Sequence, residues 1–315
     1  MSHSIKTVLV IGSGPKGGYI ASRLHEKGVK VMIMARPERR TMIALRGLHI
    51  ESLSGRFRRP VPTVAPTDVG GKFDLIIAAC RSHQLFDALD AALARMTIGT
   101  PVLSLADGGP HLLDLRKRYV LRPVIEGIFE GRTIVDADGC IRHRMPAARI
   151  RLRPDHHYAG LVAEVAHLLT GRGLVAAVAQ DFEQAVWTRS IFLAAAVGTM
   201  AITGRPLRDA LRLNTGHIHF GHMVGEGRDI AARFNVRISP RMVAEYVRGL
   251  SFEGEPISAP PSVSSPGGAG AEAHYLLAPM FDRAEQVHCQ APSLNRALEV
   301  ADAANGADTP TEQLA

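Results

Sequence analysis

Short continuous apolar runs alternate with helical stretches through the first half of the chain. Four such runs stand at residues 6–12, 29–34, 74–79 and 101–105. Apolar runs of this length without polar alternation are typical of strands buried on both faces of a parallel sheet. Helical stretches separate them, as at 17–27 and 83–96, so the pattern predicts βαβ units and a doubly wound α/β sheet.

The pattern changes near residue 180. Asp181 is a plausible N-cap for a long apolar helix that runs to about residue 203. Further helical patterns follow at 206–213, 216–234, 240–249, 270–287 and 292–304. No strand pattern stands among them, so the second half predicts an all-helical domain.

These patterns define a domain plan. We expect a Rossmann-type domain at 1–180, a helical substrate or dimerisation domain at 181–304, and a disordered tail at 305–315. Residues 252–270 are rich in proline, glycine and serine, which predicts a loop inside the helical domain. The composition, 46% hydrophobic and 21% charged residues, is that of a globular protein.

Cysteine and charge narrow the class. Three widely spaced cysteines, Cys80, Cys140 and Cys289, indicate neither a disulfide framework nor a zinc site, and favour a reducing, cytoplasmic setting. We expect no signal peptide and no membrane span, because no apolar run reaches the roughly 18 residues that a span needs. The net charge of +7 suits either an ordinary basic surface or a polyanionic ligand. With 5% aromatic residues, nucleic-acid binding is not expected.

A glycine fingerprint follows the first predicted strand and opens a helix. It reads Gly-Ser-Gly-Pro-Lys-Gly, the G-x-G-x-x-G pattern of dinucleotide-binding domains. Its first glycine permits a tight turn, its second lets a pyrophosphate approach, and its third lets the helix pack closely. The free N–H groups of the helix N-terminus then bind phosphates. The predicted cofactor-binding residues are Gly12, Ser13, Gly14, Pro15, Lys16 and Gly17.

The end of the second strand selects the nucleotide. NAD sites usually place an acidic residue there, for the ribose hydroxyls. This chain has Arg36, with Arg39 and Arg40 close behind. A guanidinium pairs with a 2′-phosphate, so the sequence favours NADP(H) over NAD(H). Glu38 would reverse this preference if it, and not Arg36, points into the site.

The chain resembles the ketopantoate reductases, which have a 6-phosphogluconate-dehydrogenase-like fold. Residues 8–24, VLVIGSGPKGGYIASRL, are similar to the family's opening, and residues 181–204 are similar to its interdomain helix. Glu272-Ala-His-Tyr275 resembles a later Glu-x-x-Tyr stretch. The resemblance implies an active site between two domains, where NADPH delivers hydride to the ketone of a 2-oxo acid.

The departures from that family concern the substrate side. Arg189 stands where the family has a lysine as general acid, and Leu193 and Val197 replace two asparagines.

Arg81 matches a family lysine after the third strand, and Asp107 lies in the turn that matches the family's Gln-Asn-Gly. We therefore add Arg81 and Asp107 to the predicted cofactor-binding residues.

The resemblance makes Arg189 and Glu272 the candidate catalytic residues. Arginine has a pKa above about 12 and does not serve as a proton donor at pH 7, but it can bind a carboxylate or stabilise an alkoxide. The sequence thus predicts an NADPH-dependent carbonyl reductase with altered substrate specificity and no resident metal. The alternatives are a non-redox enzyme, such as a cyclase or isomerase, and an inactive nucleotide-binding protein on the same scaffold. Each of these three hypotheses is compatible with a homodimer.

Overall fold

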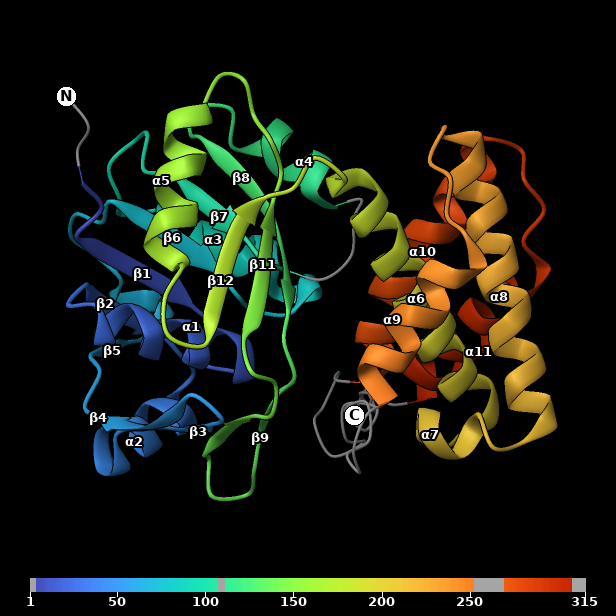
Figure 1. Ribbon diagram of the computed structural model, residues 1–315, viewed down its shortest axis with the longest axis horizontal. Coiled ribbons are helices and arrows are strands. Elements are labelled where there is room, and N and C mark those ends of the chain that lie inside the picture. The colour runs from blue at the N-terminus through green and yellow to red at the C-terminus, as the bar shows by residue number, and fades with distance from the viewer. Residues whose placement is uncertain (1–3, 107–110, 252–268, 308–315) are drawn as a thin grey trace, which may run out of the picture. The chain divides into compact units, whose positions relative to one another are not determined.

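The computed structural model describes residues 4–106, 111–251 and 269–307 (Figure 1). Within these ranges the chain separates into two compact units, one ending at Phe182 and the other beginning at Glu183. The first unit contains both β-sheets, and the second contains only helices among its described residues. Each unit is described by itself below.

The first unit is built on an eight-stranded sheet in the order β12-β11-β8-β7-β6-β1-β2-β5. The strands from β5 to β8 are parallel, whereas β11 runs antiparallel to β8. Their bounds are β1 Thr7–Ile11, β2 Lys30–Met34, β5 Thr63–Val64, β6 Leu75–Ala78, β7 Val102–Ser104, β8 Val124–Glu130, β11 Ala148–Leu152 and β12 Leu174–Val178. The four strands predicted from apolar runs are therefore β1, β2, β6 and β7.

Helices cover both faces of this sheet. In β1, Val8 and Val10 belong to a core shared with α1 and α5, while Leu9 and Ile11 belong to a second core shared with α3 and α4. This division of alternate residues explains the unbroken apolar run, because both faces of the strand are buried. The helices are α1 Pro15–Glu26, α2 Pro37–Arg46, α3 Leu85–Leu93, α4 His111–Arg118 and α5 Ala159–Leu169. The doubly wound fold predicted from the sequence is confirmed.

A smaller sheet, in the order β4-β3-β10-β9, was not predicted from the sequence. Its strands are β3 Leu48–Ser52, β4 Gly55–Arg59, β9 Thr133–Val135 and β10 Ile141–His143. One face carries Ile50, Phe57 and Ile141 into the core below α1. The opposite face carries polar and charged residues at the alternate positions, so each strand is short and amphipathic and gives a weak sequence signal.

The second unit is a bundle of helices around α6. Its members are α6 Phe182–Thr203, α7 Leu207–Ala210, α8 Asn214–Arg233, α9 Pro240–Ser251, α10 Ala269–Gln286 and α11 Pro292–Ala307. Each predicted helix of this half has a counterpart. The helix α11 continues past its predicted end at residue 304, so the first residues of the predicted tail are helical. Most of the predicted loop at 252–270 and the tail beyond Ala307 lie outside the described residues.

The helix α6 supplies much of this unit's core. Trp187 is buried and packs against Phe234, with the guanidinium of Arg283 5.4 Å from its ring. By length and composition α6 alone, among the described helices, is apolar enough to cross a membrane, but 56% of that stretch is buried within the protein. A buried core helix passes the same test, so this is weak evidence for a membrane span.

Candidate functional site

The glycine loop lies at the carboxyl end of β1, between β6 and β2. The strands β2 and β6 lie on opposite sides of β1, so the strand order reverses at this point. Sheets of α/β proteins bind ligands at such a topological switch point. Gly12 has a φ of 102°, a conformation that side chains other than glycine rarely adopt. Its N–H donates to the carbonyl oxygen of Met34 over 3.0 Å, which ties the turn to β2.

The other two glycines have the roles expected of them. A Cβ added to Gly17 would lie 2.0 Å from the carbonyl oxygen of Gly12, so only glycine lets α1 approach the turn. A Cβ added to Gly14 would meet nothing within 4 Å, so the backbone there faces open space. The helix α1 begins at Pro15 without a side-chain cap, which leaves its first N–H groups to a ligand.

Lys16 is half-buried beside the loop. Its ammonium group donates to the carbonyl oxygen of Leu105 over 2.5 Å, at the end of β7. It also lies near Cys80, where burial raises the thiol pKa to about 11 despite the positive charge of Lys16. Cys80 is therefore a neutral thiol at physiological pH. Ser13, the remaining member of the loop, is buried.

Positive charge gathers at the carboxyl ends of β2 and β6. Arg36 follows β2 as the N-cap of α2, and Arg81 follows β6; both are exposed. Burial lowers the pKa of His83, and the charges of Arg81 and Arg36 lower it further. Both guanidinium groups therefore lie near one imidazole, although they come from different loops. Arg36 and Arg81 were predicted from the sequence, whereas His83 was not, because its only sequence signal is its place two residues after Arg81.

The predicted substrate-side residues share the helical unit. Arg189, Leu193 and Val197 recur every four residues on α6, and all three are half-buried. They form one stripe along the helix, which we call the α6 stripe. Glu272 lies in α10, and its side chain is outside the described residues, as is the whole of Asp107. The catalytic roles expected of Arg189 and Glu272 stay predictions.

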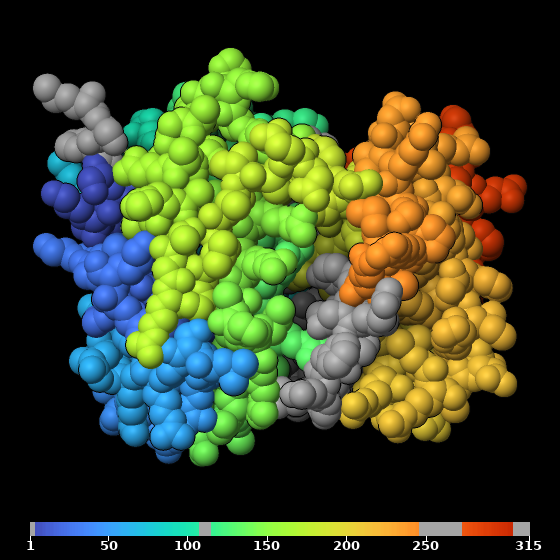
Figure 2. All heavy atoms as spheres, viewed as in Figure 1, coloured from blue at the N-terminus to red at the C-terminus, as the bar shows by residue number. Residues whose placement is uncertain are grey.

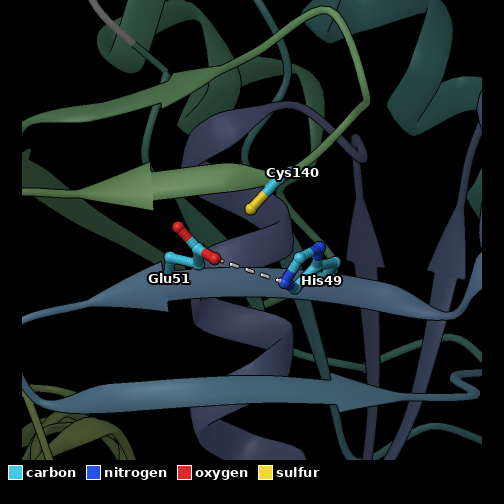
Figure 3. A group of neighbouring side chains, drawn as sticks. All are labelled: His49, Glu51 and Cys140. Atoms are coloured by element: carbon cyan, nitrogen blue, oxygen red, sulfur yellow. Dashed lines mark ion pairs between the residues drawn. The ribbon is translucent and has the colours of Figure 1, made fainter.

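A second group of reactive side chains lies on the small sheet, away from the glycine loop. His49 and Glu51 point to the same side of β3, and Cys140 reaches them from the start of the neighbouring strand (Figure 3). Their ligand atoms all lie within 4.8 Å of one another. A sulfur, a nitrogen and an oxygen in this arrangement could hold a zinc ion in principle.

The surroundings of this group disfavour a cation. Glu51 already pairs with Arg142 over 2.7 Å and with Arg56 over 3.7 Å. Burial, together with the charges of Asp136 and Glu51, raises the pKa of the Cys140 thiol, and the neutral thiol is a poor metal ligand. A divalent ion here would also lie beside two guanidinium groups. The expectation of no resident metal stays a prediction.

The first unit is similar in sequence to a known family of proteins. Residues 8–154 match the family described as ketopantoate reductase PanE/ApbA. An uncharacterized oxidoreductase of Bacillus subtilis, YkpB, is 23% identical over 298 residues, with 91% of this chain and 94% of the relative covered.

Solved structures extend the similarity over both units. D-mandelate dehydrogenase with NADH and anilino(oxo)acetate superposes with a TM-score of 0.80 at 18% identity, covering 96% of this chain and 99% of that one. A PanE/ApbA family ketopantoate reductase from Ralstonia eutropha gives 0.78 at 22% identity, with 96% and 99% covered. The sequence of residues 8–154 is therefore similar to that of the ketopantoate reductase family, and the fold of each unit is the one found in these solved structures.

Proposed function

We propose that this protein is an NADPH-dependent reductase of a 2-oxo acid or related carbonyl, with a substrate more apolar than ketopantoate. The observation that carries the proposal is the open glycine loop at the end of β1, flanked by the positive charges of Arg36 and Arg81. The kinship with oxidoreductases is consistent with it.

The residues of the loop fit a dinucleotide. Gly14 faces open space, and α1 begins uncapped, so its N–H groups would hold the pyrophosphate. Arg36, and with it Arg81, would hold the 2′-phosphate that distinguishes NADPH from NADH. The similar D-mandelate dehydrogenase structure contains NADH, so the preference for NADPH rests on these two side chains.

Bound NADPH would supply hydride to the carbonyl carbon of the substrate. The role left to Arg189 is electrostatic: its guanidinium binds the substrate carboxylate or stabilises the oxygen that gains negative charge. Because arginine does not release a proton at neutral pH, that oxygen takes its proton from water or from another acid. Glu272 remains the candidate partner that orients the substrate.

The α6 stripe supports an apolar substrate. Leu193 and Val197 offer no hydrogen bonds, and both pack against the core of the helical unit. A pocket that lacks hydrogen-bonding partners discriminates against hydroxylated acids such as ketopantoate, since their hydroxyl groups would lose water without replacement. Aryl or branched alkyl 2-oxo acids meet this requirement better than ketopantoate does.

A second candidate is nucleotide binding without reduction, either in a non-redox enzyme or in an inactive protein. Arg189 in place of a general acid is the observation that favours it. Titration with NADPH and NADH, followed by measurement of NADPH consumption on a panel of 2-oxo acids, separates the two. Turnover on an apolar 2-oxo acid supports the reductase. Tight NADPH binding without consumption on any carbonyl supports the alternative, and the absence of nucleotide binding contradicts both.

A further inference from the structure

The first unit has a pocket of roughly 300 Å³ between α2 and the small sheet. Its walls come from α2, from β3 and β4, and from β10 with the turn before it. In the space-filling view, the blue segment from α2 to β4 and the green segment that contains β9 and β10 lie side by side (Figure 2). Neither the glycine loop nor Arg36 lines it, so it is separate from the proposed nucleotide site.

Arginine dominates the lining. Arg39 and Arg46 come from α2, Arg58 from β4 and Arg142 from β10, together with the imidazole of His49. The carboxylates that line it are Asp136 and Asp138. Arg142 is already neutralised, since it pairs with Asp136 over 3.0 Å and with Glu51 over 2.7 Å. The other charged side chains of the lining are three guanidinium groups and one carboxylate, that of Asp138, so the pocket carries an excess of positive charge.

These three guanidinium groups keep most of their hydrogen-bond donors. Arg39 donates one N–H to the carbonyl oxygen of Gly139 over 3.1 Å, and its buried Nε has no hydrogen-bond partner. Burial lowers the pKa of Arg39, a direction that an anion held against it would oppose. Arg58 donates its Nε–H to the carbonyl oxygen of Arg46 over 2.9 Å, and Arg46 donates to the backbone carbonyl oxygen of Asp138 over a long 3.5 Å. The remaining N–H groups suit a ligand with several anionic oxygens.

We propose that this pocket binds a phosphorylated small molecule. A carboxylate is satisfied by one bidentate guanidinium, whereas a phosphate group accepts hydrogen bonds on several oxygens from donors in different directions. Two α2 arginines, a β4 arginine and His49 provide such a set. Met42 and Ile43 line the same pocket and provide apolar contact for an organic part. This inference stands apart from the proposed reductase function.

The test is calorimetric titration of the full chain at low ionic strength, with inorganic phosphate and with ribose 5-phosphate as probes. Arg58→Gln should weaken the binding of phosphate about tenfold or more, as expected for loss of a charge-assisted hydrogen bond. Arg39→Gln should do the same. Asp138→Asn should tighten binding, because it removes a negative charge from the lining of the pocket. Arg149→Gln, an exposed arginine on β11 that does not line the pocket, is the matched control.

The outcomes are distinguishable. Tighter binding of ribose 5-phosphate than of phosphate assigns the site to a phosphometabolite, and equal binding assigns it to phosphate itself. Thermal unfolding identifies any variant that fails to fold. If Arg39→Gln fails to fold, the variants at Arg58 and Asp138 still test the proposal, because both side chains are exposed. Phosphate affinity unchanged by Arg58→Gln and by Asp138→Asn would overturn the proposal. So would a Zn²⁺ affinity that Cys140→Ser abolishes, with no phosphate binding.

Discussion

The carbonyl oxygen of Gly12 occupies the place where a side chain at Gly17 would begin, 2.0 Å from the position of its Cβ. The turn after β1 and the first turn of α1 are therefore in direct contact, and that contact aims the helix N-terminus at the end of β1. Gly14, between them, faces open space. The same motif thus contains a glycine required for folding and a glycine reserved for a ligand.

This contrast predicts different outcomes for two alanine substitutions. Gly17→Ala should destabilise the protein by about 1–3 kcal/mol or more, because the methyl group overlaps backbone that cannot move freely. Gly14→Ala should leave the free energy of unfolding nearly unchanged and weaken nucleotide binding, because its methyl group intrudes only when a pyrophosphate is present. Urea unfolding and NADPH titration of both variants measure this. Equal effects on stability would show that the two glycines have one role.

The charges near His83 predict the nucleotide preference. NADPH should bind much more tightly than NADH, and Arg36→Ala should remove most of that difference, since a charge-assisted contact contributes about 1.5–3 kcal/mol. Arg81→Ala should reduce the difference further. Fluorescence titration with both nucleotides is the measurement, and Arg241→Ala on α9 is a control outside the first unit. Equal dissociation constants in the unmodified protein would contradict the assignment.

The α6 stripe predicts poor activity on ketopantoate. Arg189 stands in place of a general acid, and Leu193 and Val197 in place of asparagines. The kcat/KM for ketopantoate should therefore be below about 10⁴ M⁻¹s⁻¹, the lower end of the ordinary enzyme range. The triple change Arg189→Lys, Leu193→Asn, Val197→Asn should raise it, because it restores a proton donor and two hydrogen-bond partners. Steady-state assay with NADPH is the measurement. A kcat/KM in that range for the unmodified protein would show that the α6 stripe does not govern specificity.

Arg189 and Glu272 are expected to act together. Arg189→Leu and Glu272→Gln should each abolish activity on the best substrate while leaving thermal stability and NADPH affinity nearly unchanged, since neither lies in the nucleotide-binding unit. Retained activity in either single variant would remove that residue from the mechanism.

A buried histidine predicts how stability depends on pH. His143 is 1% exposed, stacks 4.5 Å from the ring of Tyr19, and has no hydrogen-bond partner on either ring nitrogen. Burial, with the charge of Arg23, lowers its pKa to about 4. His143 becomes protonated below about pH 6.5 in the unfolded chain, but only below about pH 4 in the folded protein. The free energy of unfolding should therefore fall as the pH drops from 6.5 to 4, and at pH 5 the loss due to His143 should be about 2 kcal/mol.

Two substitutions test whether His143 produces this pH dependence. His143→Phe keeps the stacking on Tyr19 and should flatten this dependence, whereas His156→Phe, at an exposed position, should leave it intact. Free energies of unfolding in urea at pH 7.5 and pH 5 measure the difference. The same slope in His143→Phe as in the unmodified protein would mean that other groups produce it.

The sequence by itself determined the doubly wound sheet, the helical second half and the glycine loop. Those features are local: an apolar run predicts a strand buried on both faces, and glycine at fixed spacing predicts a turn that a bulkier residue cannot form. It also pointed to Arg36 from its place after the second predicted strand, and to Arg81 from its match to a lysine of the ketopantoate reductase family.

Only the tertiary structure decided which distant residues meet. His83 joined Arg36 and Arg81 because parallel strands end at one edge of the sheet, although the residues are far apart in sequence. The arginine-lined pocket depends on the parallel pairing of β10 with β3, which brings the turn near residue 139 beside α2. Short amphipathic strands and long-range pairing leave little local signal, because what holds them is burial against a core built from other segments.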